Sequence, residues 1–149
     1  MRIKRVTILT VFKERKEYLI KILLLTYIFS YIGATYNHTM DLLKYGLFPY
    51  QNVSIILNIY WTMLTLLDFL AIVVLFFHID LGLIFYGLII ISDVIVNYSF
   101  MILTKGIWSW INFGQISQML FLVIYLSTFH YIHKKSQEIN EKHLTTAST

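Results

Sequence analysis

Four long runs of apolar residues constrain the fold of this chain more than any other feature of its sequence. A helix that rises about 1.5 Å per residue needs about 20 residues to cross about 30 Å of hydrocarbon, and each run has about that length. Backbone N–H and C=O groups in hydrocarbon must be paired internally, and the runs lack the alternation of membrane β-strands. The sequence therefore predicts an all-α integral membrane four-helix bundle in a single transmembrane domain, residues 1–149. The expected spans cover residues 18–35, 54–77, 81–103 and 111–132.

The composition also favours a lipid environment. Hydrophobic residues make up 58% of the chain and charged residues only 13%, with a mean hydropathy of +0.69. Soluble domains carry about twice this share of charge, so the composition excludes a soluble globule and argues against nucleic acid as a partner. The lipid bilayer is the expected partner, together with a second copy of the chain or another membrane protein. The chain has no cysteine, which excludes disulfides and thiolate chemistry, and we expect no cofactor.

The positive residues indicate how the chain is oriented. Ten of the twelve lysine and arginine residues lie before or at the start of the first run or after the fourth run. Lys44 and Lys105 are the other two. Because positive residues close to membrane spans prefer the cytoplasmic side, we expect both termini to be cytoplasmic and the membrane to be the bacterial inner membrane. Residues 1–17 and 133–149 are then basic cytoplasmic tails.

Two interpretations of residues 1–17 remain open. Their mixture of basic and apolar residues fits a short helix on the membrane surface, but we favour a solvated tail that only sets the orientation. The first run could also be a signal peptide cleaved near Ala34. The long polar lead and the presence of Thr26 and Ser30 in the run argue against cleavage, so we expect the first span to be retained.

The connections between the runs differ in length. Residues 37–52 form the only sizeable loop, in which residues 40–48 are predicted to form a short interfacial helix that Gly46 and Pro49 end. Residues 78–80 are a tight helical hairpin. Trp108 and Trp110 lie between the third and fourth runs, where tryptophan is typical of the headgroup level.

Asp68 and Asp93 are the most informative residues of the spans. An ionisable residue near the bilayer centre costs at least about 2.5 kcal/mol on insertion scales, so it is expected inside the bundle or beside water. The two residues fall at similar depths on helices joined by a tight hairpin, and neighbouring helices pack about 8–10 Å apart, so their side chains can meet. Two carboxyl groups in a low dielectric do not both ionise, and no lysine or arginine lies deep enough to pair with them. This pattern predicts a site for a proton or a small ligand such as an amine.

Each aspartate shares its helix face with other polar or aromatic side chains. Amide and hydroxyl side chains also hold membrane helices together, at about 0.6 kcal/mol per hydrogen bond, so a purely structural role is the alternative. The site candidates besides the aspartates are Asn58, Trp61 and Thr65 on the second run, and Tyr86 and Asn97 on the third. Weaker stripes are Thr26, Ser30, Gly33 and Asn37 on the first run, and Gln115, Gln118 and Tyr125 on the fourth.

The histidines give weaker signals. On the outer side, His38 and Asp41 are candidates for the mouth of a binding site, with a solvated loop start as the alternative. At the cytoplasmic end, the spacing of imidazoles and a carboxylate would suit a metal, but this pattern is not specific and we expect no metal site. The residues concerned are His78, Asp80, His130 and His133.

Two segments resemble one known group of proteins. Residues 58–68, with the sequence NIYWTMLTLLD, and residues 91–97, with the sequence ISDVIVN, are similar to signatures of an uncharacterised family of small bacterial four-span membrane proteins. The resemblance covers the second and third runs only. It implies the four-span fold and, because the family has no assigned activity, it implies no function.

Three functional hypotheses follow from the sequence. The first is a non-enzymatic membrane protein whose polar interior binds a small ligand or a proton at the two carboxyl groups. The second is a partner-binding accessory or immunity-type protein in which the polar stripes are only structural. The third is a membrane-embedded enzyme that acts on a lipid-like substrate. No catalytic residues are predicted, because the chain has no GxSxG, HExxH or phosphate-binding loop motif.

Overall fold

Helices make up almost all of the part of the chain that the structure describes. The computed structural model describes residues 6–14, 17–50, 53–105 and 113–146, in which no strand is present. The four long helices are each long and apolar enough to cross a membrane, which confirms the all-α prediction with four candidate spans. The helices are α1 (Ile8–Lys13), α2 (Tyr18–Tyr45), α3 (Ile55–Phe77), α4 (Ile79–Lys105) and α5 (Phe113–Thr146).

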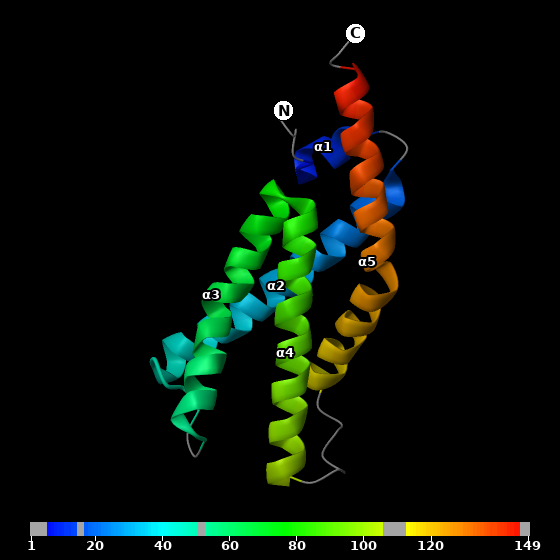
Figure 1. Cartoon of the computed structure of the whole chain (residues 1–149). Coiled ribbons are helices and arrows are strands. Elements are labelled where there is room, and N and C mark those ends of the chain that lie inside the picture. The colour runs from blue at the N-terminus through cyan, green and yellow to red at the C-terminus, as the bar shows by residue number, and fades with distance from the viewer. Residues whose placement is uncertain (1–5, 15–16, 51–52, 106–112, 147–149) are drawn as a thin grey trace.

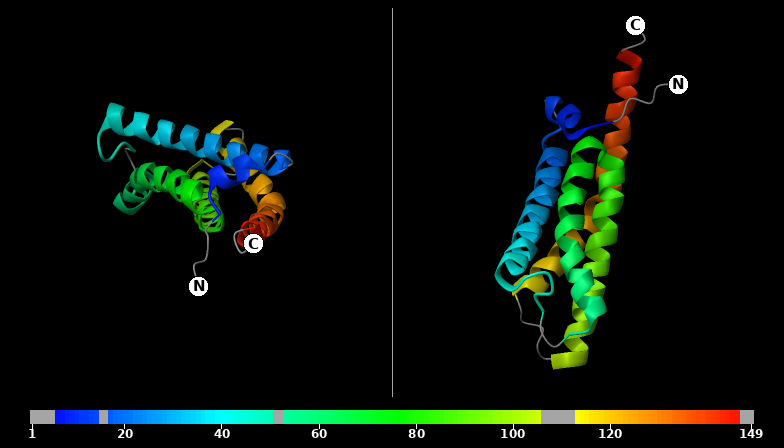
Figure 2. Two further views of the ribbon diagram at one scale, coloured as in Figure 1. Left: turned by 90° about the horizontal axis from the view of Figure 1, so that it is seen from above. Right: turned by 90° about the vertical axis from the view of Figure 1, so that its left-hand side faces the viewer.

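The long helices pack in the order of the sequence. α2 packs against α3, α3 against α4 and α4 against α5, with a smaller contact between α2 and α5 (Figure 1). The two termini lie at the same end of the bundle as the α3–α4 connection at His78, which we call the hairpin end (Figures 1 and 2). The opposite end carries the connection between α2 and α3, and we call it the loop end. α5 extends beyond the hairpin (Figure 1).

The polar connection expected at residues 37–52 is shorter in the structure. α2 continues without a break to Tyr45, so the prediction of a separate short helix at residues 40–48 is wrong. Gly46 ends α2 with a φ of 85°, a left-handed conformation that glycine adopts without steric cost. α3 then begins after Ser54, whose side chain accepts a hydrogen bond from the Leu57 backbone N–H. The prediction that Gly46 ends a helix was therefore correct, but the helix that ends there is α2 and not a separate short helix.

The two basic tails are also more ordered than expected. Residues 133–146 continue α5 as helix, in which Ser136 and Ile139 are buried. Residues 6–14 are not a solvated tail, because the Ile79 backbone N–H donates a hydrogen bond to the Val6 carbonyl and α1 packs on α2 and α3. Residues 1–5 and 111–112, and the two tryptophans Trp108 and Trp110, lie outside the described residues. The buried residues of this N-terminal segment are Val6, Ile8 and Val11.

Buried side chains follow a single seam along α3. Their spacing of three or four residues is that of helices packed as in a coiled coil. The same seam carries both apolar and polar residues, so the polar side chains of α3 lie inside the bundle because they share the register of its core. The buried residues of α3 are Asn58, Trp61, Leu64, Asp68, Ala71 and Leu75.

The hairpin between α3 and α4 depends on a close approach at Gly82. A Cβ atom at this position would overlap the backbone of Leu75 on the preceding helix, whereas a Cβ atom at Gly33 would meet nothing within 4 Å. We expect Gly82→Ala to lower the free energy of unfolding by about 1–3 kcal/mol, because the helices must move apart. Gly33→Ala is the matched control and should leave stability unchanged or raise it by up to about 1 kcal/mol, because alanine favours a helix over glycine. Thermal unfolding in detergent, followed by circular dichroism, measures both, and equal midpoints would contradict the prediction.

Candidate functional site

The buried polar side chains of the bundle form two groups with different hydrogen bonding. The first group contains Asp93 and connects α3, α4 and α5. The second contains Asp68 and lies between α2 and α3. We call the second group the Asp68 site, and it consists of Thr35, His38, Thr65 and Asp68.

Asp93 is held by a complete hydrogen-bond network. Asn97 Nδ2 donates to Asp93 Oδ1 at 2.7 Å, and Gln118 Nε2 donates to Asp93 Oδ2 at 2.7 Å. Trp61 Nε1 donates to Asn97 Oδ1 at 2.8 Å. Each carboxylate oxygen therefore has an amide donor, and the network joins three helices. This arrangement is typical of structural polar contacts between membrane helices.

Asp68 is buried without comparable partners. Its residue is 2% exposed, and it makes no hydrogen bond within the described part of the chain. Among the described residues, the basic side chain beside it is His38, whose Nε2 atom lies 3.9 Å from Asp68 Oδ2. This separation is longer than a hydrogen bond. The sequence analysis found no partner for this carboxyl group because it placed His38 in a loop instead of on α2.

Three unpartnered polar atoms belong to the same group as Asp68. Thr35 Oγ1, Thr65 Oγ1 and His38 Nδ1 are buried and have no hydrogen-bond partner. Thr35 lies three residues before His38, and Thr65 lies three residues before Asp68, so each threonine shares a helix face with one of the two residues. An unpaired buried polar group costs about 1–3 kcal/mol, and such groups are rare. Three of the five such atoms in the described residues therefore belong to this group.

The expected site with two carboxyl groups is thus divided. Asp68 and Asp93 are close enough to interact electrostatically, but no hydrogen bond joins them in the described residues. The amides of Asn97 and Gln118 surround Asp93, whereas Asp68 faces His38 on α2. Of the two carboxyl groups, Asp68 is the one without a hydrogen bond among the described residues.

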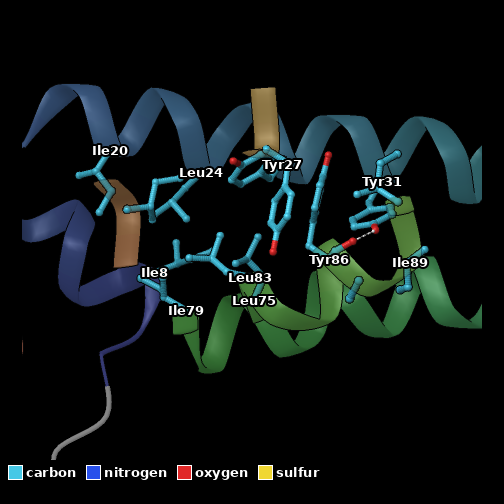
Figure 3. Packing of buried hydrophobic residues seen from close by; sticks show 14 of the residues in the cluster. Ile8, Ile20, Leu24, Tyr27, Tyr31, Leu75, Ile79, Leu83, Tyr86 and Ile89 are labelled. Carbon is cyan, nitrogen blue, oxygen red and sulfur yellow. Dashed lines mark hydrogen bonds between the residues drawn. The ribbon is translucent and has the colours of Figure 1, made fainter. Parts of the chain in front are cut away.

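Tyr86 lies in an aromatic layer between the Asp68 site and the hairpin end. Its ring centre is 4.5 Å from that of Tyr27 and 4.4 Å from that of Tyr31, and the Tyr31 hydroxyl donates to the Tyr86 carbonyl at 2.9 Å (Figure 3). The Tyr86 hydroxyl shares a hydrogen bond with Ser30 at 3.0 Å. Tyr125 stacks on Tyr86 from α5, with ring centres 5.6 Å apart. Tyr86 therefore helps to hold α2, α4 and α5 together.

The predicted polar stripe on the first helix is only partly correct. Ser30 faces the bundle, but Gly33 and Asn37 are exposed, so the stripe does not lie on the buried face. The buried face instead contains the two tyrosines that contact Tyr86, and the sequence analysis did not identify them. The sequence pattern that could have identified these tyrosines is their spacing, because they continue the series of buried apolar residues of α2 at intervals of three or four. The buried residues of α2 are Ile20, Leu24, Tyr27 and Tyr31.

Asn58 and Asp41 bind the loop end of the chain instead of the Asp68 site. Asn58 Nδ2 donates to the Tyr50 carbonyl, and the Tyr50 N–H donates to Asn58 Oδ1 at 3.3 Å. The Tyr50 hydroxyl donates to Asp41 Oδ2 at 2.9 Å. Burial and this hydrogen bond raise the pKa of Tyr50, so its hydroxyl remains a donor at neutral pH. Of the predicted outer pair, Asp41 is hydrogen-bonded to Tyr50, and His38, one helical turn away on α2, faces Asp68.

The polar residues of the hairpin end form a structural contact. His133 Nδ1 lies 2.9 Å from Asp80 Oδ1, and Gln137 Nε2 donates to Asp80 Oδ2 at 2.9 Å. No group of three or more histidine, aspartate or glutamate residues is placed to hold a metal ion within the residues that the structure describes. His78 and His130 therefore do not complete a metal-ligand cluster with the other two. The contact joins α5 to the start of α4.

Comparisons with known proteins identify no family for this chain. No family model, curated protein or solved structure matches it significantly. What the structure supports of the resemblance seen at residues 58–68 and 91–97 is the presence of four long apolar helices, and no family is identified. Functional conclusions have to come from the geometry of the bundle.

The Asp93 network predicts that alanine substitutions of two glutamines of α5 affect stability differently. Gln118→Ala removes one donor from a buried carboxylate, so we expect it to lower the free energy of unfolding by about 1–3 kcal/mol. Gln115→Ala is the matched control, because Gln115 Oε1 is buried without a hydrogen-bond partner. This variant should be neutral or slightly stabilising. Chemical unfolding of both variants in detergent measures the difference, and an equal loss would contradict the structural role of the network.

Proposed function

We propose that this four-helix membrane protein is non-enzymatic and binds a proton or a small proton-bearing cation at Asp68 inside its bundle. The observation that supports the proposal is the contrast between the two buried aspartates. Asp93 has an amide donor at each oxygen, whereas Asp68 has one partner at 3.9 Å and three unpartnered polar atoms in its group. A structural carboxyl group would be expected to have the first environment, not the second.

The residue types of the Asp68 site suit a positively charged ligand. An ionised carboxylate buried without donors is costly, and a proton or an ammonium group removes this cost by neutralising or pairing the charge. An ammonium group offers three N–H donors, and the carboxylate and the two threonine hydroxyls are acceptors for them. His38 adds an imidazole, the side chain whose ordinary charge change falls closest to physiological pH. These groups can therefore exchange a proton among themselves and with a ligand.

The orientation in the membrane is part of the proposal. We propose that the hairpin end faces the cytoplasm of a bacterial cell and that the protein lies in the inner membrane. The support is the distribution of positive charge, because lysines cluster at the hairpin end, and the described exceptions are Lys44 and Lys105 at the far ends of α2 and α4. The described lysines at the hairpin end are Lys13, Lys21, Lys134, Lys135 and Lys142.

Infrared spectroscopy tests the proposed role of Asp68. In membranes titrated with acid and base, we expect the wild-type protein to show the signal of a buried carboxyl group that gains and loses a proton, separate from the signals of its water-exposed carboxyl groups. Asp68→Asn should abolish most of this signal, because an amide does not titrate. Asp93→Asn is the matched control and should retain it. Circular dichroism would confirm that both variants are helical.

Two results would contradict the proposal. One is a titrating carboxyl signal that persists in Asp68→Asn and disappears in Asp93→Asn. The other is a wild-type protein in which no buried carboxyl group titrates over the pH range where the fold is stable. The comparison distinguishes Asp68 from Asp93 by the titrating carboxyl signal, and a general loss of stability would not remove this signal from one variant alone.

A second function is favoured by the Asp93 network. If the polar side chains serve only to join helices, as they do around Asp93, the protein would be an accessory or immunity-type protein that acts through a membrane partner. This function predicts that Asp68→Asn leaves biological activity intact. It also predicts that a second protein purifies with the chain after crosslinking in membranes.

A further inference from the structure

A short segment folds across the loop end of the bundle above the Asp68 site. The segment is residues 46–50, which we call the strap. Thr62 Oγ1 donates to the Leu47 carbonyl at 2.8 Å, and Pro49 is buried. The reciprocal hydrogen bonds between Asn58 and Tyr50 fix the end of the strap to the first turn of α3. The strap is therefore attached along α3 at several points.

Tyr50 connects the strap to α2 as well. Its ring packs edge-on against Trp61 of α3 with 4.9 Å between centres, and its hydroxyl donates to Asp41 of α2 at 2.9 Å. Asp41 lies one helical turn beyond His38, on the same face of α2. Tyr50 therefore bridges α2 and α3 directly outside the His38–Asp68 pair. Besides the hydrogen bond from the Gly46 N–H to the Leu42 carbonyl that ends α2, the bond to Asp41 is the one that joins the strap to α2 among the described hydrogen bonds.

The route from Asp68 toward the hairpin end has a different character. Beyond the tyrosine layer, the facing residues of α2, α3 and α4 are aliphatic and almost fully buried (Figure 3). α1 covers this end, with Ile8 and Val11 in the same core cluster. A packed aliphatic region of this kind holds no water. The residues are Ile20, Leu24, Ala71, Leu75, Ile79 and Leu83.

We propose that the Asp68 site exchanges its proton or small cation with water only at the loop end, and that Tyr50 is the gate of this route. The hydrogen bond from Tyr50 to Asp41 keeps the gate closed, and its opening exposes His38 and then Asp68. This inference rests on the proposed function of the Asp68 site. The other titratable side chains that act electrostatically on Asp68 are Tyr31, Tyr60, Tyr86 and Asp93.

The absence of cysteine makes the route directly measurable. Thr65→Cys introduces one thiol, of nearly the size of the threonine side chain, into a chain that has none. The variant is placed in sealed vesicles whose orientation is determined by protease cleavage of a C-terminal tag. A membrane-impermeant, positively charged methanethiosulfonate reagent is then added from one side. We expect labelling from the side opposite the termini and none from the side of the termini.

The gate is tested by removing its hydrogen bond. Tyr50→Phe keeps the ring on Trp61 but loses the hydroxyl, so we expect the labelling rate of Thr65→Cys to rise about tenfold, as for loss of one hydrogen bond to a charged group. Tyr45→Phe is the matched control, because Tyr45 is exposed and its hydroxyl makes no hydrogen bond within the described residues. This control should leave the rate unchanged.

A double-mutant cycle identifies the partner of the gate. Asp41→Ala should raise the labelling rate about as much as Tyr50→Phe, and the combined variant should be no faster than either single variant, because both remove the same interaction. Equal rates in the wild-type background and in both single variants would overturn the role of Tyr50. Labelling from the side of the termini would overturn one-sided access.

Two further reporters protect the test against a variant that does not fold. Thr35→Cys probes the same site from α2 and should follow the pattern of Thr65→Cys. Ala71→Cys lies in the apolar region toward the hairpin end and should not react from either side. Labelling does not require Asp68 to bind a proton, so the two proposals can fail separately. Correct labelling with no titration of Asp68 would contradict the proposed function alone, and titration with labelling from the other side would contradict only the route.

Discussion

In an apolar environment a polar side chain must find its hydrogen-bond partner inside the protein, and the structure of this bundle depends on how completely each buried polar side chain is paired. Asp93 succeeds, because Asn97 and Gln118 supply an amide to each oxygen and so fix α4 against α5. Asp68 succeeds only in part, because His38 is at 3.9 Å and its neighbours Thr35 and Thr65 are unpartnered. The same physical requirement therefore produces a fully paired carboxyl group in one place and an incompletely paired one in the other.

Packed aromatic and aliphatic side chains separate Asp68 from the hairpin end of the bundle. Aromatic rings from α2, α4 and α5 meet around Tyr86, and aliphatic residues continue from there to the hairpin end. On the other side, His38 lies beside Asp68, and Tyr50 of the strap makes a polar contact with Asp41, one helical turn beyond His38. A site with one packed side and one polar side is suited to exchange with a single aqueous phase.

Sequence reasoning identified the aspartates and their companions by the cost of burying polar groups. It placed Asp68, Trp61 and Asn97 inside the bundle, and the structure confirms that these side chains face its interior. It failed for His38 because the apolar run ends near residue 35, whereas the helix continues until Gly46 provides a left-handed residue. It failed for Tyr31 because it assigned the buried face of α2 to a stripe of small and polar residues. The buried face instead consists of aliphatic and aromatic residues, spaced three or four apart, that include Tyr31.

The sequence by itself determined that four apolar helices form and that Asp68 and Asp93 lie within them, because helix length and backbone pairing in hydrocarbon leave no other arrangement. It also determined where the chain turns, at Gly46 and at the hairpin of residues 78–80, whereas the close approach at Gly82 is seen only in the structure. Only the tertiary structure decided which carboxyl group is satisfied. That outcome depends on the rotation of each helix about its axis, which brings Gln118 to Asp93 and leaves His38 beyond hydrogen-bond distance of Asp68. Hydropathy is insensitive to this rotation, because it records how apolar a segment is and not which residues of other helices its side chains meet.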